Sequence, residues 1–209
     1  MLTHATALFD GELRLTTTEP GDVPLTILPA PASLSCNGKP LPGKPDGAFT
    51  RYTVPALAAS PVEPAVSLIR NAGSLRQVRL GAAKVAEQPA DADFEQAAVW
   101  KITLPPNVDP ARRLLLRIHY KGDVARAYVG DTLLTDNFYN GTPFDIGLWR
   151  AGPAAHRHGV TLKVLPLQKD APIHMLDAAR PDFAGNASIA SVDAVEIIES
   201  HDLLLTVQW

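Results

Sequence analysis

The sequence predicts an all-β protein built from antiparallel strands, and the stretch from Arg112 to Leu148 carries most of that prediction. Within it, apolar side chains alternate with mostly charged or polar ones, the apolar set being Leu114, Leu116, Ile118 and Tyr120. A period of two gives a strand one buried face and one wet face. Gly130-Asp131 and Asn140-Gly141 add two turn signals between extended segments. No capped segment of a dozen residues shows helical periodicity, so we expect helices of a single turn at most.

The first part of the chain reads as short strands with frequent interruptions. Asn37-Gly38 lies between extended segments and predicts a hairpin, and prolines recur between positions 29 and 45. Because proline cannot donate to a strand ladder, these strands should be short or lie at sheet edges. We therefore predict a small β-rich segment over residues 1–58, and the aperiodic, proline-bearing residues 59–65 are expected to form a linker.

The remainder, residues 66–209, is expected to form one β-sandwich. Residues 66–73 are consistent with either a strand or a short helix. Two later segments alternate clearly, with inward-facing sets at Trp100, Ile102 and Leu104 and at Val160, Leu162 and Val164. Residues 192–200 and 203–209 supply two further strands, which we expect to complete the same sandwich.

Composition excludes several classes of partner. The chain has 209 residues, a net charge of −3 and a pI near 6.0, so a nucleic-acid partner is not expected. No apolar stretch is long enough to span a membrane, and the N-terminus does not resemble a signal peptide. Cys36 is the only cysteine, which leaves the compartment undecided.

One segment carries a family resemblance. GDVARAYVGDTLLTDNFYNGTPFDIGLWR, residues 122–150, resembles the C-terminal jelly-roll region of bacterial β-galactosidases of glycoside hydrolase family 35. The likeness continues in residues 91–105, DADFEQAAVWKITLP, and in residues 159–175, GVTLKVLPLQKDAPIHM. It implies that residues 66–209 form an antiparallel jelly-roll β-sandwich of the galactose-binding-like type, and that the parent protein is exported to the periplasm or the exterior.

The resemblance also implies a function without catalysis. The chain would be an accessory region that packs on or flanks a catalytic barrel not present in this chain. No nucleophile, zinc or phosphate-loop motif occurs, and the chain is short for a barrel of about 250 residues. We therefore assign no catalytic residues, since a glycosidase needs two carboxylates facing each other across the scissile bond.

Metal sites are not indicated either. His156 and His158 lack a third ligand nearby in sequence, so a solvated loop between Pro153 and Gly159 is the favoured interpretation. Related sandwiches often hold a structural calcium. Its possible ligands here are Asp91, Asp93, Asp182 and Asp193, although no spacing singles them out.

A weak sugar site is the alternative function, in which the chain is a carbohydrate-binding module for galactosides. Tyr139 or Trp149 would stack on the apolar face of the sugar, while Asn137, Asn140 and Arg150 would bind its hydroxyls. This requires the loops to meet at one end of the sandwich. A purely structural interpretation stays open, in which Phe138, Phe144 and Trp149 pack in the core and the two asparagines form turns.

Overall fold

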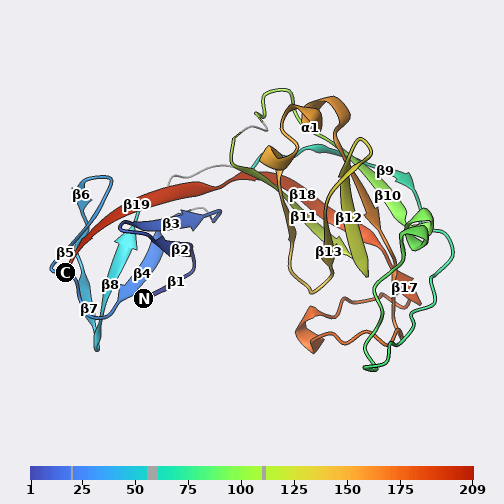
Figure 1. Ribbon diagram of the computed structural model, residues 1–209, viewed down its shortest axis with the longest axis horizontal. Helices are drawn as coiled ribbons and strands as arrows, with labels where there is room; N and C mark the ends of the chain where they lie inside the picture. The colour runs from blue at the N-terminus through green and yellow to red at the C-terminus, as the bar shows by residue number, and fades with distance from the viewer. Residues whose placement is uncertain (20, 56–60, 110–111) are drawn as a thin grey trace. The chain divides into compact units, whose positions relative to one another are not determined.

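A computed structural model describes residues 1–19, 21–55, 61–109 and 112–209 of the chain. The structure is all-β, which confirms the predicted fold class, and every described strand register is antiparallel. It divides into two units. The larger unit spans Val62–Ile197, and the smaller combines Met1–Pro61 with Ile198–Trp209 (Figure 1).

The larger unit contains a five-stranded sheet and a three-stranded sheet. The five-stranded sheet has the order β13 (Thr132–Phe138), β12 (Val124–Val129), β15 (Val160–Val164), β10 (Ala98–Thr103) and β9 (Ala65–Arg70). The three-stranded sheet has the order β14 (Phe144–Gly147), β11 (Leu114–Lys121) and β18 (Ser191–Glu199). Side chains from both sheets enter one apolar core, as in a β-sandwich.

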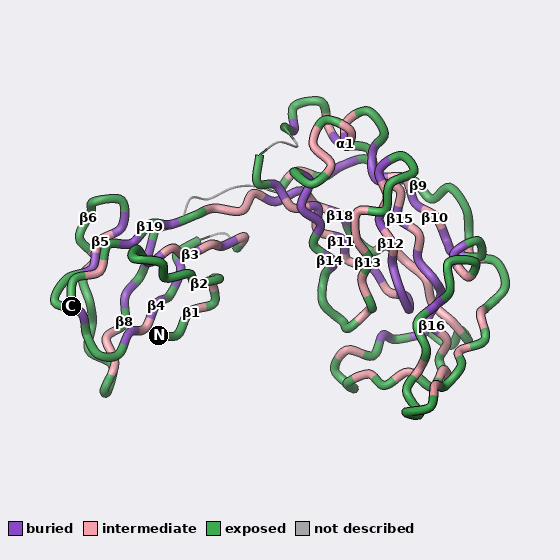
Figure 2. Tube along the Cα trace, in the orientation of Figure 1, coloured by how far each residue is buried: buried purple, intermediate pink, exposed green. Residues whose placement is uncertain are grey.

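The alternating pattern of the sequence locates this core correctly. All four predicted inward residues of β11 are buried, and so are the predicted inward sets of β10 and β15. Figure 2 shows buried segments along β11, β12 and β15. The predicted Gly130-Asp131 hairpin joins β12 to β13, with Val129 opposite Thr132 and Gly130 at a φ of 57°. A φ in this range favours glycine.

Helical structure in the described ranges is limited to short pieces, although two of them have six residues and so exceed the single turn that we expect from the sequence. Three are 3-10 turns, η1 (Asp91–Gln96), η2 (Leu148–Arg150) and η3 (Asp177–Ala179). The fourth is α1 (Pro153–His158), which corrects the predicted loop around His156 and His158. Proline at its first position suits a helix start, because the missing N–H has no intrahelical partner there. A small ladder of β16 (Leu167–Gln168) and β17 (Ser188–Ile189) completes this unit.

The described residues of the smaller unit form two sheets. The first has the order β1 (Leu2–Thr3), β4 (Val23–Ile27), β8 (Phe49–Val54) and β7 (Lys44–Asp46). The second has the order β2 (Thr6–Phe9), β3 (Leu13–Thr17), β19 (His201–Gln208), β5 (Ser33–Cys36) and β6 (Lys39–Pro40). The predicted Asn37-Gly38 turn joins β5 to β6.

The last strand differs from its expected place. The sequence predicts that residues 203–209 complete a sandwich running from 66 to 209. Instead β19 lies between β3 and β5 and buries Leu203 and Leu205 in the core of the smaller unit. The pattern of the strand is the expected one, but its partner strands lie in the first 61 residues. The two-residue alternation of a strand indicates which of its faces is buried. It does not indicate against which sheet that face packs.

The predicted linker, residues 59–65, lies partly within the described residues. Residues 59 and 60 lie outside the described residues, whereas Val62 pairs with Ile197 through an isolated bridge and β9 begins at Ala65. Among the described residues, none of the helices could serve as a membrane span.

Candidate functional site

A small hollow lies at one end of the three-stranded sheet of the larger unit. We call it the Tyr139 pocket; its volume is about 140 Å³. Its walls come from the end of β11, the loop between β13 and β14, and the start of β18. The lining residues are His119, Tyr120, Lys121, Tyr139, Gly141, Thr142, Pro143 and Asp193.

The alternation of β11 sets the character of this pocket. Tyr120 faces the core and is buried, so His119 and Lys121 on either side of it face outward. Lys121 Nζ lies 2.6 Å from Asp193 Oδ2 on β18, and Ser191 Oγ donates to Asp193 Oδ1 at 2.9 Å. His119 Nε2 is 3.5 Å from Glu196 Oε1. The outer face of this end of the sheet therefore carries cross-strand pairs of polar side chains.

Tyr139 is held against the core by Tyr120. Their rings meet edge to face, with centroids 5.5 Å apart and an interplanar angle of 72°. The Tyr139 backbone N–H donates to the carbonyl oxygen of Asp123 at 2.9 Å. This arrangement fixes the ring while leaving it partly exposed, which is the state in which an aromatic ring can stack on a ligand.

The pocket side chains Tyr139, Lys121 and Asp193 have shifted pKa values. Burial raises the pKa of the Tyr139 phenol, so the hydroxyl stays protonated and able to donate. The hydrogen bond to Asp193 raises the pKa of Lys121. Burial pushes the pKa of Asp193 upward, yet hydrogen bonds from Lys121 and Ser191 leave it lowered. At neutral pH the pocket thus offers a fixed phenol and a stable ion pair.

The predicted sugar-binding residues separate into two groups. Asn137, Tyr139 and Asn140 lie near the end of β11, whereas Trp149 and Arg150 follow Gly147, which pairs with Leu115 near the beginning of that strand. Strand β14 runs between the two groups, so the structure does not bring them to one end. Trp149 and Arg150 are both exposed, away from the Tyr139 pocket.

Of the first group, only Tyr139 lines the pocket. The Asn137 amide donates from Nδ2 to the Tyr120 hydroxyl at 2.9 Å, and that hydroxyl donates to the Asn137 carbonyl oxygen at 3.1 Å. Asn140 Oδ1 accepts from the Thr142 N–H at 3.0 Å and from Thr142 Oγ1 at 2.6 Å. Asn137 therefore positions Tyr120, and Asn140 forms the turn that the structural interpretation anticipated.

The three aromatic residues that the structural interpretation places in the core differ in their burial. Phe144 is buried in the core, whereas Phe138 and Trp149 are exposed. His119, Lys121 and Thr142 were not among the predicted site residues. The alternation of β11 indicates that His119 and Lys121 share a wet face, but their proximity to Asp193 depends on the pairing of β11 with β18.

The four aspartates considered for calcium have other partners. Asp91 pairs with Arg126, Asp193 pairs with Lys121, and Asp93 and Asp182 accept from the backbone N–H groups of Ala90 and Ala184. Within the described ranges no group of three or more metal-binding side chains occurs. His156 Nε2 contacts the carbonyl oxygen of Val108.

Comparisons of the chain with protein-family models, with curated proteins and with solved structures found no match.

Proposed function

We propose that this chain is a non-catalytic accessory region of a β-galactosidase-like glycoside hydrolase of family 35, with its larger unit as a jelly-roll sandwich of the galactose-binding-like type. It would pack on or flank a catalytic barrel. The resemblance over residues 122–150 covers β12, β13, β14 and the Tyr139 loop. An uncovered apolar surface on β9 is the observation on which the proposal rests.

The uncovered surface arises because one sheet is wider than the other. On edge strand β9, Val66 pairs with Ile102 of β10 and Leu68 pairs with Trp100, so they share the inward face. Ile102 and Trp100 are 0% and 7% exposed, but Val66 and Leu68 are 39% and 50% exposed. The inward face thus continues beyond the core into solvent. An uncovered apolar sheet edge of this kind is typical of an interface with another domain.

The first test is assembly with the barrel. We expect the chain to bind the catalytic barrel of the family 35 enzyme from its own source, prepared without an accessory region. Replacing Val66 and Leu68 together by Asp should weaken the complex roughly 30-fold, since charges would enter an apolar interface. Analytical ultracentrifugation measures this affinity.

A matched control uses an exposed apolar residue elsewhere in the same unit. Val85→Asp should leave the affinity unchanged, because Val85 is exposed and lies outside β9. Absence of a complex, or equal weakening by Val85→Asp, would count against the accessory role. Hydrolysis of a nitrophenyl galactoside by the chain alone would contradict the non-catalytic assignment.

The Tyr139 pocket favours a second candidate function, weak galactoside binding. A partly exposed ring beside His119, Lys121, Asp193 and Thr142 provides both an apolar platform and hydroxyl-binding groups. Bound sugar would remain near the catalytic barrel and raise the local substrate concentration. The small volume of the hollow suits one sugar ring.

Titration with galactose, followed by NMR, tests this candidate. We expect Tyr139→Ala to weaken binding about tenfold through loss of stacking, and Tyr139→Phe to retain most of it. Phe138→Ala is the control, because Phe138 is adjacent and exposed but does not line the pocket. Trp149→Ala should have no effect either. Equal affinity in Tyr139→Ala, or loss in Trp149→Ala alone, would exclude this site.

A further inference from the structure

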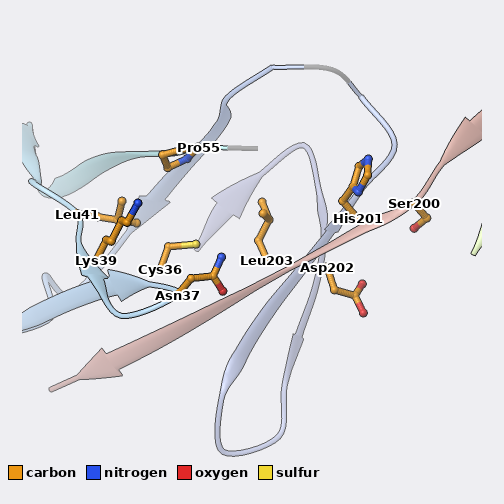
Figure 3. Close-up of a pocket in the computed structure, with 9 residues that line it drawn as sticks. All are labelled: Cys36, Asn37, Lys39, Leu41, Pro55, Ser200, His201, Asp202 and Leu203. Atoms are coloured by element: carbon orange, nitrogen blue, oxygen red, sulfur yellow. The ribbon is translucent and has the colours of Figure 1, made fainter. Parts of the chain in front are cut away.

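The smaller unit contains a larger hollow, which we call the Cys36 pocket. Its volume is about 440 Å³, within the range typical of small-molecule sites. The nine residues labelled in Figure 3 line it, and all belong to the smaller unit. It shares no lining residue with the Tyr139 pocket.

The course of two neighbouring strands explains this hollow. On β19, Leu203 and Leu205 face the core, and His201 is the next position of the same face toward the start of the strand. On β5, Cys36 lies opposite Leu205 and is followed by the Asn37-Gly38 turn. The pocket therefore opens at the start of β19, where His201 takes the place that Leu203 and Leu205 occupy further along the same face.

The floor of the pocket is apolar. Cys36 and Leu203 are buried and approach each other from β5 and β19 in Figure 3, and Leu41 and Pro55 complete this surface. Burial raises the pKa of the Cys36 thiol, so at neutral pH the sulfur is a neutral, apolar group. This surface suits a compact hydrocarbon or aromatic body.

The polar groups lie on either side of that floor. In Figure 3 Lys39 and His201 are on opposite sides of Cys36 and Leu203. His201 Nε2 is shielded from solvent and has no hydrogen-bond partner within the described part of the chain. A shielded ring nitrogen without a partner costs free energy, and a hydrogen bond to a ligand beside His201 would recover part of that cost.

The charge balance favours an anion. Among the described residues that line the pocket there is one lysine, Lys39, and one carboxylate, Asp202. That carboxylate is engaged elsewhere, because its Oδ1 accepts from Thr16 Oγ1 at 2.7 Å and its Oδ2 lies 4.0 Å from Arg14 Nη1. The positive charge of Arg14 thus balances the negative charge of Asp202. The charge of Lys39 then makes the pocket positive. The amide of Asn37 adds further donors.

From these observations we propose that the Cys36 pocket binds small monocarboxylic acids that have a compact apolar body and a hydrogen-bonding group at the far end. The carboxylate lies at Lys39, the body covers Cys36 and Leu203, and the far group bonds to His201. 4-Hydroxybenzoate has all three features. Benzoate lacks the far group, and 4-hydroxybenzyl alcohol lacks the charge.

The chain provides its own reporter for this binding. Cys36 is its only cysteine, so alkylation by iodoacetamide, followed by intact mass, reads out this pocket alone. We expect 4-hydroxybenzoate to slow alkylation in a saturable manner, benzoate to do so with about fivefold weaker affinity, and the neutral alcohol weaker still. In His201→Leu the affinity for 4-hydroxybenzoate should fall to that for benzoate.

Two lysines provide a matched pair of variants. Lys39→Ala should weaken the binding of 4-hydroxybenzoate about fivefold. Lys44→Ala should not change this affinity, because Lys44 is also an exposed lysine but lies on β7 and does not line the pocket. Both side chains are exposed, so neither substitution disturbs the core.

Backbone NMR gives a second readout that does not depend on thiol reactivity. Amides of Lys39, Ser200 and Leu203 should shift in a saturable way with 4-hydroxybenzoate. The absence of such shifts, or binding that is equal for the acid and the alcohol and unchanged in Lys39→Ala, would overturn the proposal. Protection of Cys36 by galactose and not by the acids would assign the pocket to sugars instead.

Discussion

Ending the chain after Glu199 is expected to unfold the smaller unit while the larger unit keeps its fold. The removed residues include the whole of β19, which is the middle strand of a five-stranded sheet. Without it, β3 and β5 lose their shared neighbour, and Leu203 and Leu205 leave the core. Each buried leucine contributes about 2–5 kcal/mol. Together these losses match the whole stability of a small domain, about 5–15 kcal/mol.

Amide hydrogen exchange measures this outcome strand by strand. Protection should disappear from β3, β4 and β8 in the shortened chain and persist in β11 and β15. Single substitutions supply the control. Leu205→Ala, at 1% exposure, should cost about 2–5 kcal/mol, whereas Leu204→Ala, at 41% exposure, should cost about 0.5 kcal/mol or less. Retained protection in β3 after truncation would show that β19 is dispensable.

The second large effect is expected at the buried ion pair of the larger unit. Arg76 donates from Nε and Nη2 to Asp123 Oδ2, at 3.0 and 2.7 Å, and the two side chains are only 8% and 7% exposed. Asp123→Ala should lower the free energy of unfolding by about 3–5 kcal/mol, because it leaves the guanidinium buried without its partner. Replacing both residues by Leu should cost far less, since no unpaired charge remains.

Urea unfolding followed by tryptophan fluorescence tests this, in a Trp209→Phe background in which the remaining tryptophans, Trp100 and Trp149, lie in the larger unit. Asp145→Ala is the control, because its ion pair with Arg117 is more exposed and should contribute about 1 kcal/mol or less. A loss no larger than that of Asp145→Ala would contradict the argument.

The pair also has a pH signature. Burial raises the pKa of Asp123, and the contacts with Arg76 only partly reverse the effect. A carboxyl whose pKa is higher in the folded state binds protons more readily there than in the unfolded chain. Between the two pKa values this group therefore adds stability as the pH falls. Asp123→Ala should remove that contribution from the pH profile of the unfolding free energy.

Local patterns in the sequence predict the strands of this protein better than their partners. The alternation of β11 identifies each of its buried residues, because burial on one face follows directly from strand geometry. The placement of β19 cannot be predicted in this way. Its leucines alternate equally well for either sheet, and pairing with β3 is a contact between residues nearly 190 positions apart, for example Thr16 and Asp202.

For the candidate site too, the sequence predicts local features better than contacts between distant segments. Tyr139 could be predicted, since an aromatic residue next to an Asn-Gly turn belongs to a loop. The separation of Tyr139 from Trp149 follows from the pairing of Phe144–Gly147 with β11, because this strand carries the chain along the sheet between the two residues. The contribution of Asp193 depends on which strand lies beside β11, and no local signal indicates that.

The division of the smaller unit between the two ends of the sequence has a consequence for synthesis. Residues 1–61 leave the ribosome before the larger unit, but their middle strand follows only after Val62–Ile197 has been translated. At about 5–20 residues per second, this delay is on the order of ten seconds. During that time the apolar faces of β3 and β5 have no strand between them, so we expect the larger unit to fold first and nascent β3 and β5 to be targets for chaperones.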